Sequence, residues 1–153
     1  MILKRDTTIP GRSLEEVFEF FSDPVNLGRI TPKSLGFEIL EAPSRKLRKG
    51  DRIRYRIRLL GVPIHWVTLI EEWREGQSFV DLQERGPYTL WRHVHDFVEV
   101  PEGVRMSDLV EYELPLGIVG RIVGGWLVRR QLNAIFDFRE RVIRELFSER
   151  SGL

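Results

Sequence analysis

The chain has 153 residues, of which 42% are hydrophobic and 31% charged, a composition typical of a folded protein and not of a disordered segment. We expect residues 1–153 to form a single domain. The 24 basic and 23 acidic residues leave a net charge of +1, which argues against a nucleic acid partner. No cysteine is present, which excludes disulfides, thiolate metal ligands and cysteine nucleophiles. Because no apolar run of about 18 residues occurs, we predict no transmembrane segment and a cytoplasmic location.

The first predicted elements are a strand and a short helix. Residues Ile2–Ile9 favour a strand, which Pro10 and Gly11 end. Ser13, followed three positions later by Glu16, matches a capping box and predicts the start of a helix. The pair Asp23-Pro24 ends this helix, and we expect a short second helix or turn around residues 25–30.

A period of two dominates the middle of the chain. Between Asp51 and Leu59, arginines alternate with Ile, Tyr and Leu, which predicts a strand with one exposed and one buried face. Turn signals containing glycine or proline separate further runs of this kind. They predict an antiparallel meander with strands at Phe37–Leu40, Asp51–Leu59, Ile64–Trp73, Ser78–Glu84, Thr89–Val100 and Val104–Leu114.

The last part of the chain predicts one long helix. Residues Ile118–Phe147 contain no proline and keep apolar residues at helical spacing. We expect an apolar stripe that includes Ile122, Trp126 and Phe136 to face the sheet. The predicted fold class is therefore α+β, with helices packed on one face of an antiparallel sheet.

Several segments carry a resemblance to a known superfamily. They are Phe79–Gln83, Gly86–Tyr88, Trp91–Phe97, Asp108–Tyr112 and Leu114-Pro115. With this order of elements, the chain resembles the START and Bet v 1 (SRPBCC) superfamily, in particular a bacterial branch related to polyketide cyclases and dehydrases. The resemblance covers essentially the whole chain. It implies a helix-grip fold, in which a curved antiparallel sheet wraps around the C-terminal helix and leaves an internal cavity.

Strand alternation indicates which side chains face that cavity. Trp91, His93, His95 and Phe97 share one face of their strand, and Asp108 and Tyr112 share the corresponding face of the next. Aromatic walls with a few polar groups are typical of a site for a small, largely hydrophobic molecule such as a lipid, a quinone or a polyketide. The predicted ligand-binding residues are Tyr55, Trp66, Phe79, Asp81, Gln83, Trp91, His93, His95, Phe97, Asp108, Tyr112, Trp126 and Phe136.

The polar members of this set have three interpretations. In the first, hydrogen bonds between histidine and aspartate satisfy buried groups. In the second, His93 or His95 exchanges a proton while Asp108 or Asp81 orients the imidazole, as a cyclase or dehydratase requires. In the third, both imidazoles bind a metal, but the sequence offers no evident fourth ligand, so we predict neither a metal nor another cofactor.

Two surface features suggest partners. His65, Val67, Leu69, Val80 and Leu82 are assigned to the outer face of the sheet, where apolar residues predict a homodimer contact. Arg129 or Arg130 could reach the mouth of the cavity and bind a carboxylate. A module that binds a protein or a membrane is the alternative to a ligand-binding protein or an enzyme.

Overall fold

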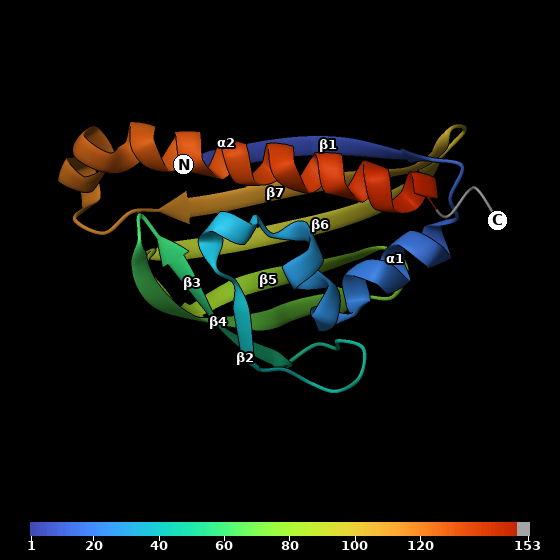
Figure 1. Ribbon diagram of the computed structural model, residues 1–153, viewed down its shortest axis with the longest axis horizontal. Coiled ribbons are helices and arrows are strands. Elements are labelled where there is room, and N and C mark those ends of the chain that lie inside the picture. The colour runs from blue at the N-terminus through green and yellow to red at the C-terminus, as the bar shows by residue number, and fades with distance from the viewer. Residues whose placement is uncertain (150–153) are drawn as a thin grey trace.

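The computed structural model describes residues 1–149 and contains one antiparallel sheet with helices against its inner face (Figure 1). The elements are β1 (Ile2–Pro10), α1 (Leu14–Ser22), the 3₁₀ helices η1 (Pro24–Ile30) and η2 (Lys33–Leu35), β2 (Glu38–Glu41), β3 (Arg52–Leu59), β4 (Val62–Arg74), β5 (Ser78–Arg85), β6 (Leu90–Val100), β7 (Gly103–Glu113) and α2 (Gly117–Glu149). These bounds confirm the predicted α+β order of elements.

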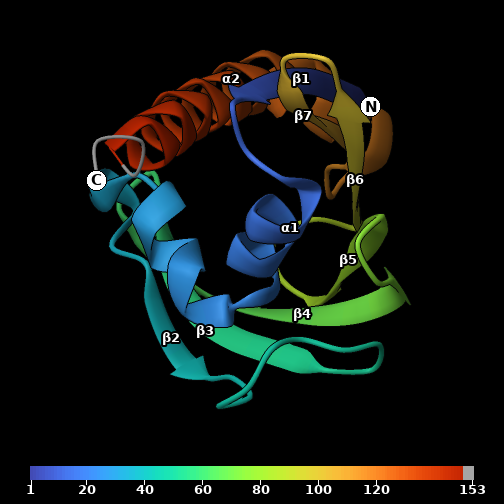
Figure 2. The same ribbon diagram turned by 90° about the vertical axis from the view of Figure 1, so that its right-hand side faces the viewer.

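The strands lie in the order β1-β7-β6-β5-β4-β3-β2, so the meander from β2 to β7 is continuous and β1 is added to its far edge. Figure 2 shows the sheet curling around α1, while α2 lies along the open side, where it contacts β1 and η1. A sheet that curls without closing leaves its two edges apart, and the long helix covers the gap between them. This is the helix-grip arrangement.

Helix α1 begins as the capping box predicts. The Ser13 hydroxyl accepts a hydrogen bond from the backbone N–H of Glu16, and the Glu16 carboxylate accepts one from the backbone N–H of Ser13. Phe18 and Phe21 face inward and pack on Phe97 of β6. This aromatic cluster fills most of one end of the space enclosed by the sheet.

Outward arginines of β3 pair with glutamates of the adjacent β2 and, across β4, of β5. Arg52 contacts Glu84 at 2.6 Å, and Arg54 contacts Glu41 at 3.1 Å. Arg92 of β6 contacts both Glu71 and Glu72 of β4, next to a bulge in β4. The arginine-rich run of the sequence is therefore an exposed strand face with cross-strand partners.

The apolar stripe predicted on the outer sheet face is smaller than the sequence suggests. Val67, Leu69 and Leu82 are half-buried, Val80 is buried, and His65 is exposed. The homodimer through this face stays a prediction.

Candidate functional site

Three neighbouring strands bring two histidines and two aspartates together. In the register of the sheet, His93 of β6 lies opposite Asp81 of β5, and His95 lies opposite Asp108 of β7. The period-two alternation therefore places all four side chains on the inner face. His93, His95 and Asp108 are buried, and Asp81 is half-buried.

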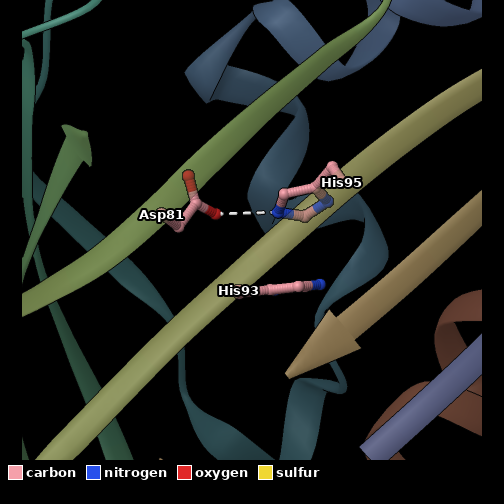
Figure 3. A group of neighbouring side chains, drawn as sticks. All are labelled: Asp81, His93 and His95. Carbon is pink, nitrogen blue, oxygen red and sulfur yellow. Dashed lines mark hydrogen bonds and ion pairs between the residues drawn. The ribbon is translucent and has the colours of Figure 1, made fainter. Parts of the chain in front are cut away.

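Each histidine bonds to the aspartate diagonally across from it. Nε2 of His93 lies 2.7 Å from Oδ1 of Asp108. Nε2 of His95 lies 2.9 Å from Oδ2 of Asp81, as Figure 3 shows beside the ring of His93. Nδ1 of His95 lies 3.2 Å from Oδ1 of Asp108, so this carboxylate contacts both rings. The ring centroids of the two histidines are 3.7 Å apart. The four groups form one buried network.

The environment shifts the pKa values of the two imidazoles in opposite directions. Burial and the neighbouring charge of His95 lower the pKa of His93 to about 4. Burial also opposes a charge on His95, but the carboxylates of Asp81 and Asp108 outweigh it and raise the pKa of His95 above its ordinary value. At neutral pH, His93 is therefore the uncharged ring, and His95 is the ring that holds a proton more strongly.

Both carboxylates are held in their ionised form. Burial by itself would raise the pKa of each, but the charge and hydrogen bond of His95 keep the pKa of Asp81 below its usual value. Hydrogen bonds with His93 and His95 lower the pKa of Asp108 further still below its usual value. An ionised carboxylate only accepts hydrogen bonds, so each Nε2 atom donates. The network can orient and polarise a bound molecule, and His93 could accept a proton through its free ring nitrogen.

A cavity of about 140 Å³ lies between this network, β3, β4 and α2. Its walls are mainly aromatic and aliphatic, and Thr68, Tyr88, Gln131 and Arg139 add polar groups. A second cavity, of about 20 Å³, lies on the side of α1 and η1 and is bordered by Phe79, Asp81 and His95. The predicted residues that line the larger cavity are Tyr55, Trp66, Asp81, Trp91, His93 and Phe136.

Other predicted residues support the site without lining either cavity. Asp108 lies behind the two imidazoles, and Phe97 belongs to the aromatic cluster with α1. The Gln83 amide exchanges hydrogen bonds with the backbone of Tyr88, and Tyr112 packs against the Tyr88 ring. For Gln83, Phe97, Asp108 and Tyr112, the prediction of the inner face holds, but neighbouring side chains separate them from the open volume.

The placement of Trp126 in the cavity is wrong. Its side chain is 71% exposed and lies with the exposed Ile122 on the first turns of α2. The helix begins beyond the tip of β7 (Figure 1), but Gly125, which precedes Trp126 in the same turn, is buried. The buried stripe of α2 consists of Gly125, Leu132, Phe136, Ile143 and Phe147, and Trp126 lies outside it on another face of the helix.

Arg139 is the important residue that the sequence prediction missed. It borders both cavities, whereas Arg129 and Arg130, the predicted candidates for the cavity mouth, border neither. A signal was present in the sequence, because position 139 continues the helical spacing of the buried residues between Phe136 and Ile143. A charged residue on a buried stripe is unusual unless it has a partner.

One group within residues 1–149 has spacing compatible with a metal ion. Asp81, His93 and His95 each offer a ligand atom within 4.8 Å of the others. The Nε2 atoms of both rings are, however, hydrogen-bonded to two different carboxylates, and the rings lie against each other. This geometry is that of a hydrogen-bonded network.

Comparison with known proteins supports the fold alone. No protein-family model and no functionally characterised protein matches this sequence. The solved structure of TTHA0849 from Thermus thermophilus is similar, with a TM-score of 0.77 and 18% identity over 99% of this chain and 100% of that one. SA2116 from Staphylococcus aureus, described as a protein of unknown function, has a TM-score of 0.72 and 14% identity over 100% of this chain and 96% of that one. A nucleoside-diphosphate sugar epimerase from Corynebacterium glutamicum has a TM-score of 0.65 and 21% identity, over 94% of this chain but 28% of the epimerase.

Proposed function

We propose that this chain is a ligand-binding member of the START and SRPBCC superfamily that holds a small, largely hydrophobic molecule between its sheet and α2. The observation that carries the proposal is the cavity of about 140 Å³ beside the histidine and aspartate network. An apolar cavity of roughly 150 Å³ is large enough to hold one benzene ring. A lipid, quinone or polyketide could place a ring or part of a chain there.

A surface groove adjoins the cavity. A groove of about 400 Å³, with almost entirely apolar walls, runs between the start of α2 and the loops beside it. Leu59, Tyr88 and Gln131 border both the groove and the cavity. A ligand longer than the inner cavity could therefore extend along the groove while one end stays inside.

Mass spectrometry tests this proposal under native conditions. The protein purified from its own host should carry a co-purifying small molecule, and the released molecule should rebind to protein stripped of ligand. The Ile135→Trp variant places an indole at the cavity wall and should abolish rebinding. Ile122→Trp is the matched control, because Ile122 is exposed on the same helix outside the cavity. If Ile135→Trp, shown to be folded, binds as well as the control, the ligand lies elsewhere.

A turnover assay with the identified ligand separates binding from catalysis. His93, which borders the cavity, is the candidate base, and the opposite pKa directions of the two histidines are what an acid–base pair needs. Cyclisation or dehydration of the bound molecule that is lost in His93→Asn would assign an enzyme. A ligand that returns chemically unchanged would assign a carrier or sensor.

A second function, binding to an anionic membrane surface, is favoured by a separate observation. Large apolar side chains are exposed together on the first turns of α2 and the nearby loops, among them Leu60, Leu116, Ile118, Val119, Ile122, Val123 and Trp126. The charged residues between Glu113 and Asp137 are all arginines, at positions 121, 129 and 130. Exposed apolar side chains next to basic ones suit an anionic bilayer interface.

Sedimentation with vesicles tests this second function. The protein should bind vesicles of phosphatidylglycerol more strongly than vesicles of phosphatidylcholine, and Val123→Glu should abolish that binding. Val98→Glu is the control, because Val98 is also an exposed apolar residue but lies on β6, outside the patch. Equal loss in both variants, or no binding by the wild type, would contradict it. None of the helices within residues 1–149 has the length and apolar character needed to cross a bilayer.

A further inference from the structure

We infer that the molecule bound in the inner cavity carries a carboxylate, and that the Arg139 guanidinium and the indole N–H of Trp66 hold it. This inference rests on the proposed ligand-binding function and specifies the class of ligand. Both residues border the 140 Å³ cavity, Arg139 from α2 and Trp66 from β4. The two residues therefore border the same space, one from the helix and one from the sheet.

Arg139 is a cation without a hydrogen-bonded counterion. Its Nε atom is buried and unpartnered, and its side chain forms no hydrogen bond or ion pair with any other residue in the range 1–149. The guanidinium instead lies 5.8 Å from the ring centroids of both Phe21 and Phe136. Arginine stays charged inside proteins, and Arg139 is half-buried, so its charge is partly withdrawn from water and gains from a partner. A ligand carboxylate would supply the partner.

Trp66 offers a second donor that also lacks an acceptor. Its side chain is 5% exposed, and no group in the described part of the chain accepts a hydrogen bond from Nε1. Tyr55 stacks on this indole at 5.9 Å, and Trp91 meets it edge to face at 5.4 Å. The ring is thus held in place by its neighbours. A buried N–H without an acceptor costs free energy, which a ligand oxygen would recover.

The remaining charges favour a monoanion over a phosphate. Asp81 borders the same cavity, and the charge of Arg139 also lowers the pKa values of Asp81 and Asp108, so these two carboxylates would repel a second negative charge on the ligand. One guanidinium and one indole N–H match the two oxygens of a carboxylate. The apolar groove that continues from the cavity would take the rest of the molecule. The inferred ligand is therefore amphiphilic, with its carboxylate inside and its apolar part toward the groove.

Calorimetric titration of three matched compounds tests the inference. The probes are decanoate, methyl decanoate and decan-1-ol, which share an apolar chain and differ in the head group. The wild type should bind decanoate at least about ten-fold more tightly than the ester or the alcohol, because only the charged head group can pair with the Arg139 guanidinium. Arg139→Met keeps a long side chain without the charge and should remove this preference, with binding of the alcohol within about two-fold of the wild type.

Two further variants keep the test decisive. Trp66→Phe keeps an aromatic ring without the N–H and should weaken decanoate binding more than alcohol binding. Arg129→Met is the control, because Arg129 lies on the same helix but borders neither cavity. If the three probes bind the wild type equally, or if folded Arg139→Met keeps the preference for decanoate, the carboxylate assignment is wrong while the ligand-binding function stands. If the wild type binds none of the probes and carries no co-purifying molecule, both proposals fail.

Discussion

Nε2 of His93 donates a hydrogen bond to Oδ1 of Asp108 across 2.7 Å, and both side chains are almost fully buried. The same oxygen lies 3.2 Å from Nδ1 of His95, so one carboxylate contacts both imidazoles. If a substitution removes one member of such a network, its buried partner is left without a hydrogen bond. The network is therefore both a support for the fold and the polar wall of the candidate site.

Replacing Asp108 with asparagine should destabilise the protein by about 3 kcal/mol, because a buried imidazole cluster loses its ionised partner. Urea unfolding followed by tryptophan fluorescence measures the change. Asp96→Asn is the matched control, since Asp96 is exposed on β6, and we expect a change within about 0.5 kcal/mol. Similar midpoints for the two variants would show that the network does not stabilise the fold.

The two buried imidazoles should titrate on opposite sides of the ordinary histidine value. Since the pKa of His93 is lowered to about 4 and the pKa of His95 is raised, NMR of the ring nitrogens at pH 6 should show His93 neutral and His95 protonated. Each assignment follows from the spectrum of the corresponding asparagine variant. Coincident titration of both rings near 6.5 would contradict the network's electrostatics.

The same shifts determine how stability depends on pH. Between pH 6.5 and 4, the unfolded chain binds a proton at His93 that the folded chain does not, so this residue lowers stability as the pH falls. His95 has the opposite effect on stability. Its stabilising contribution to the free energy of unfolding is fully present below the pKa that it has in the unfolded chain, and it is lost as the pH rises through the pKa that it has in the folded chain. We expect His93→Asn to lose less stability than the wild type on acidification across this range, as measured by urea unfolding at each pH.

Two aromatic residues of α2 should differ sharply in their contribution to stability. Phe147 is 3% exposed and packs on Phe20, so Phe147→Ala should cost about 3 kcal/mol or more. Trp126 is 71% exposed and contacts Arg130, so Trp126→Ala should change stability by less than about 1 kcal/mol. Thermal unfolding measures both. A large cost for Trp126→Ala would show that the start of α2 is covered in solution.

The hairpin between β6 and β7 depends on Gly103. Its φ is +150°, and a Cβ atom there would lie 2.2 Å from the carbonyl oxygen of Ile9, where β1 pairs with β7. We expect Gly103→Ala to destabilise the protein by more than about 2 kcal/mol. Gly76→Ala is the control: its φ is also positive, at +68°, but no atom lies within 4 Å of the new Cβ. Equal effects would mean that backbone conformation alone, and not the contact with β1, decides the cost.

Much of the site was predictable because its strands have a local period. The alternation in β6 and β7 places His93, His95 and Asp108 on the inner face, and this prediction needs only the rule that neighbouring side chains of a strand point to opposite sides. The pairing of each histidine with the aspartate diagonally across from it was not predictable. It depends on the register between strands, which the sequence of a single strand does not contain.

The sequence by itself determined the order of the elements, the period of each strand and the length of α2, because these follow from interactions between residues close together in the chain. Only the tertiary structure decided which part of α2 is covered. Leu132 and Phe136 are buried and Arg139 borders both cavities, whereas Trp126 stays exposed. The physical reason is that contacts between distant parts of the chain fix which face of α2 turns inward: Gly125 is buried on that face, whereas Trp126 in the same turn points away from it.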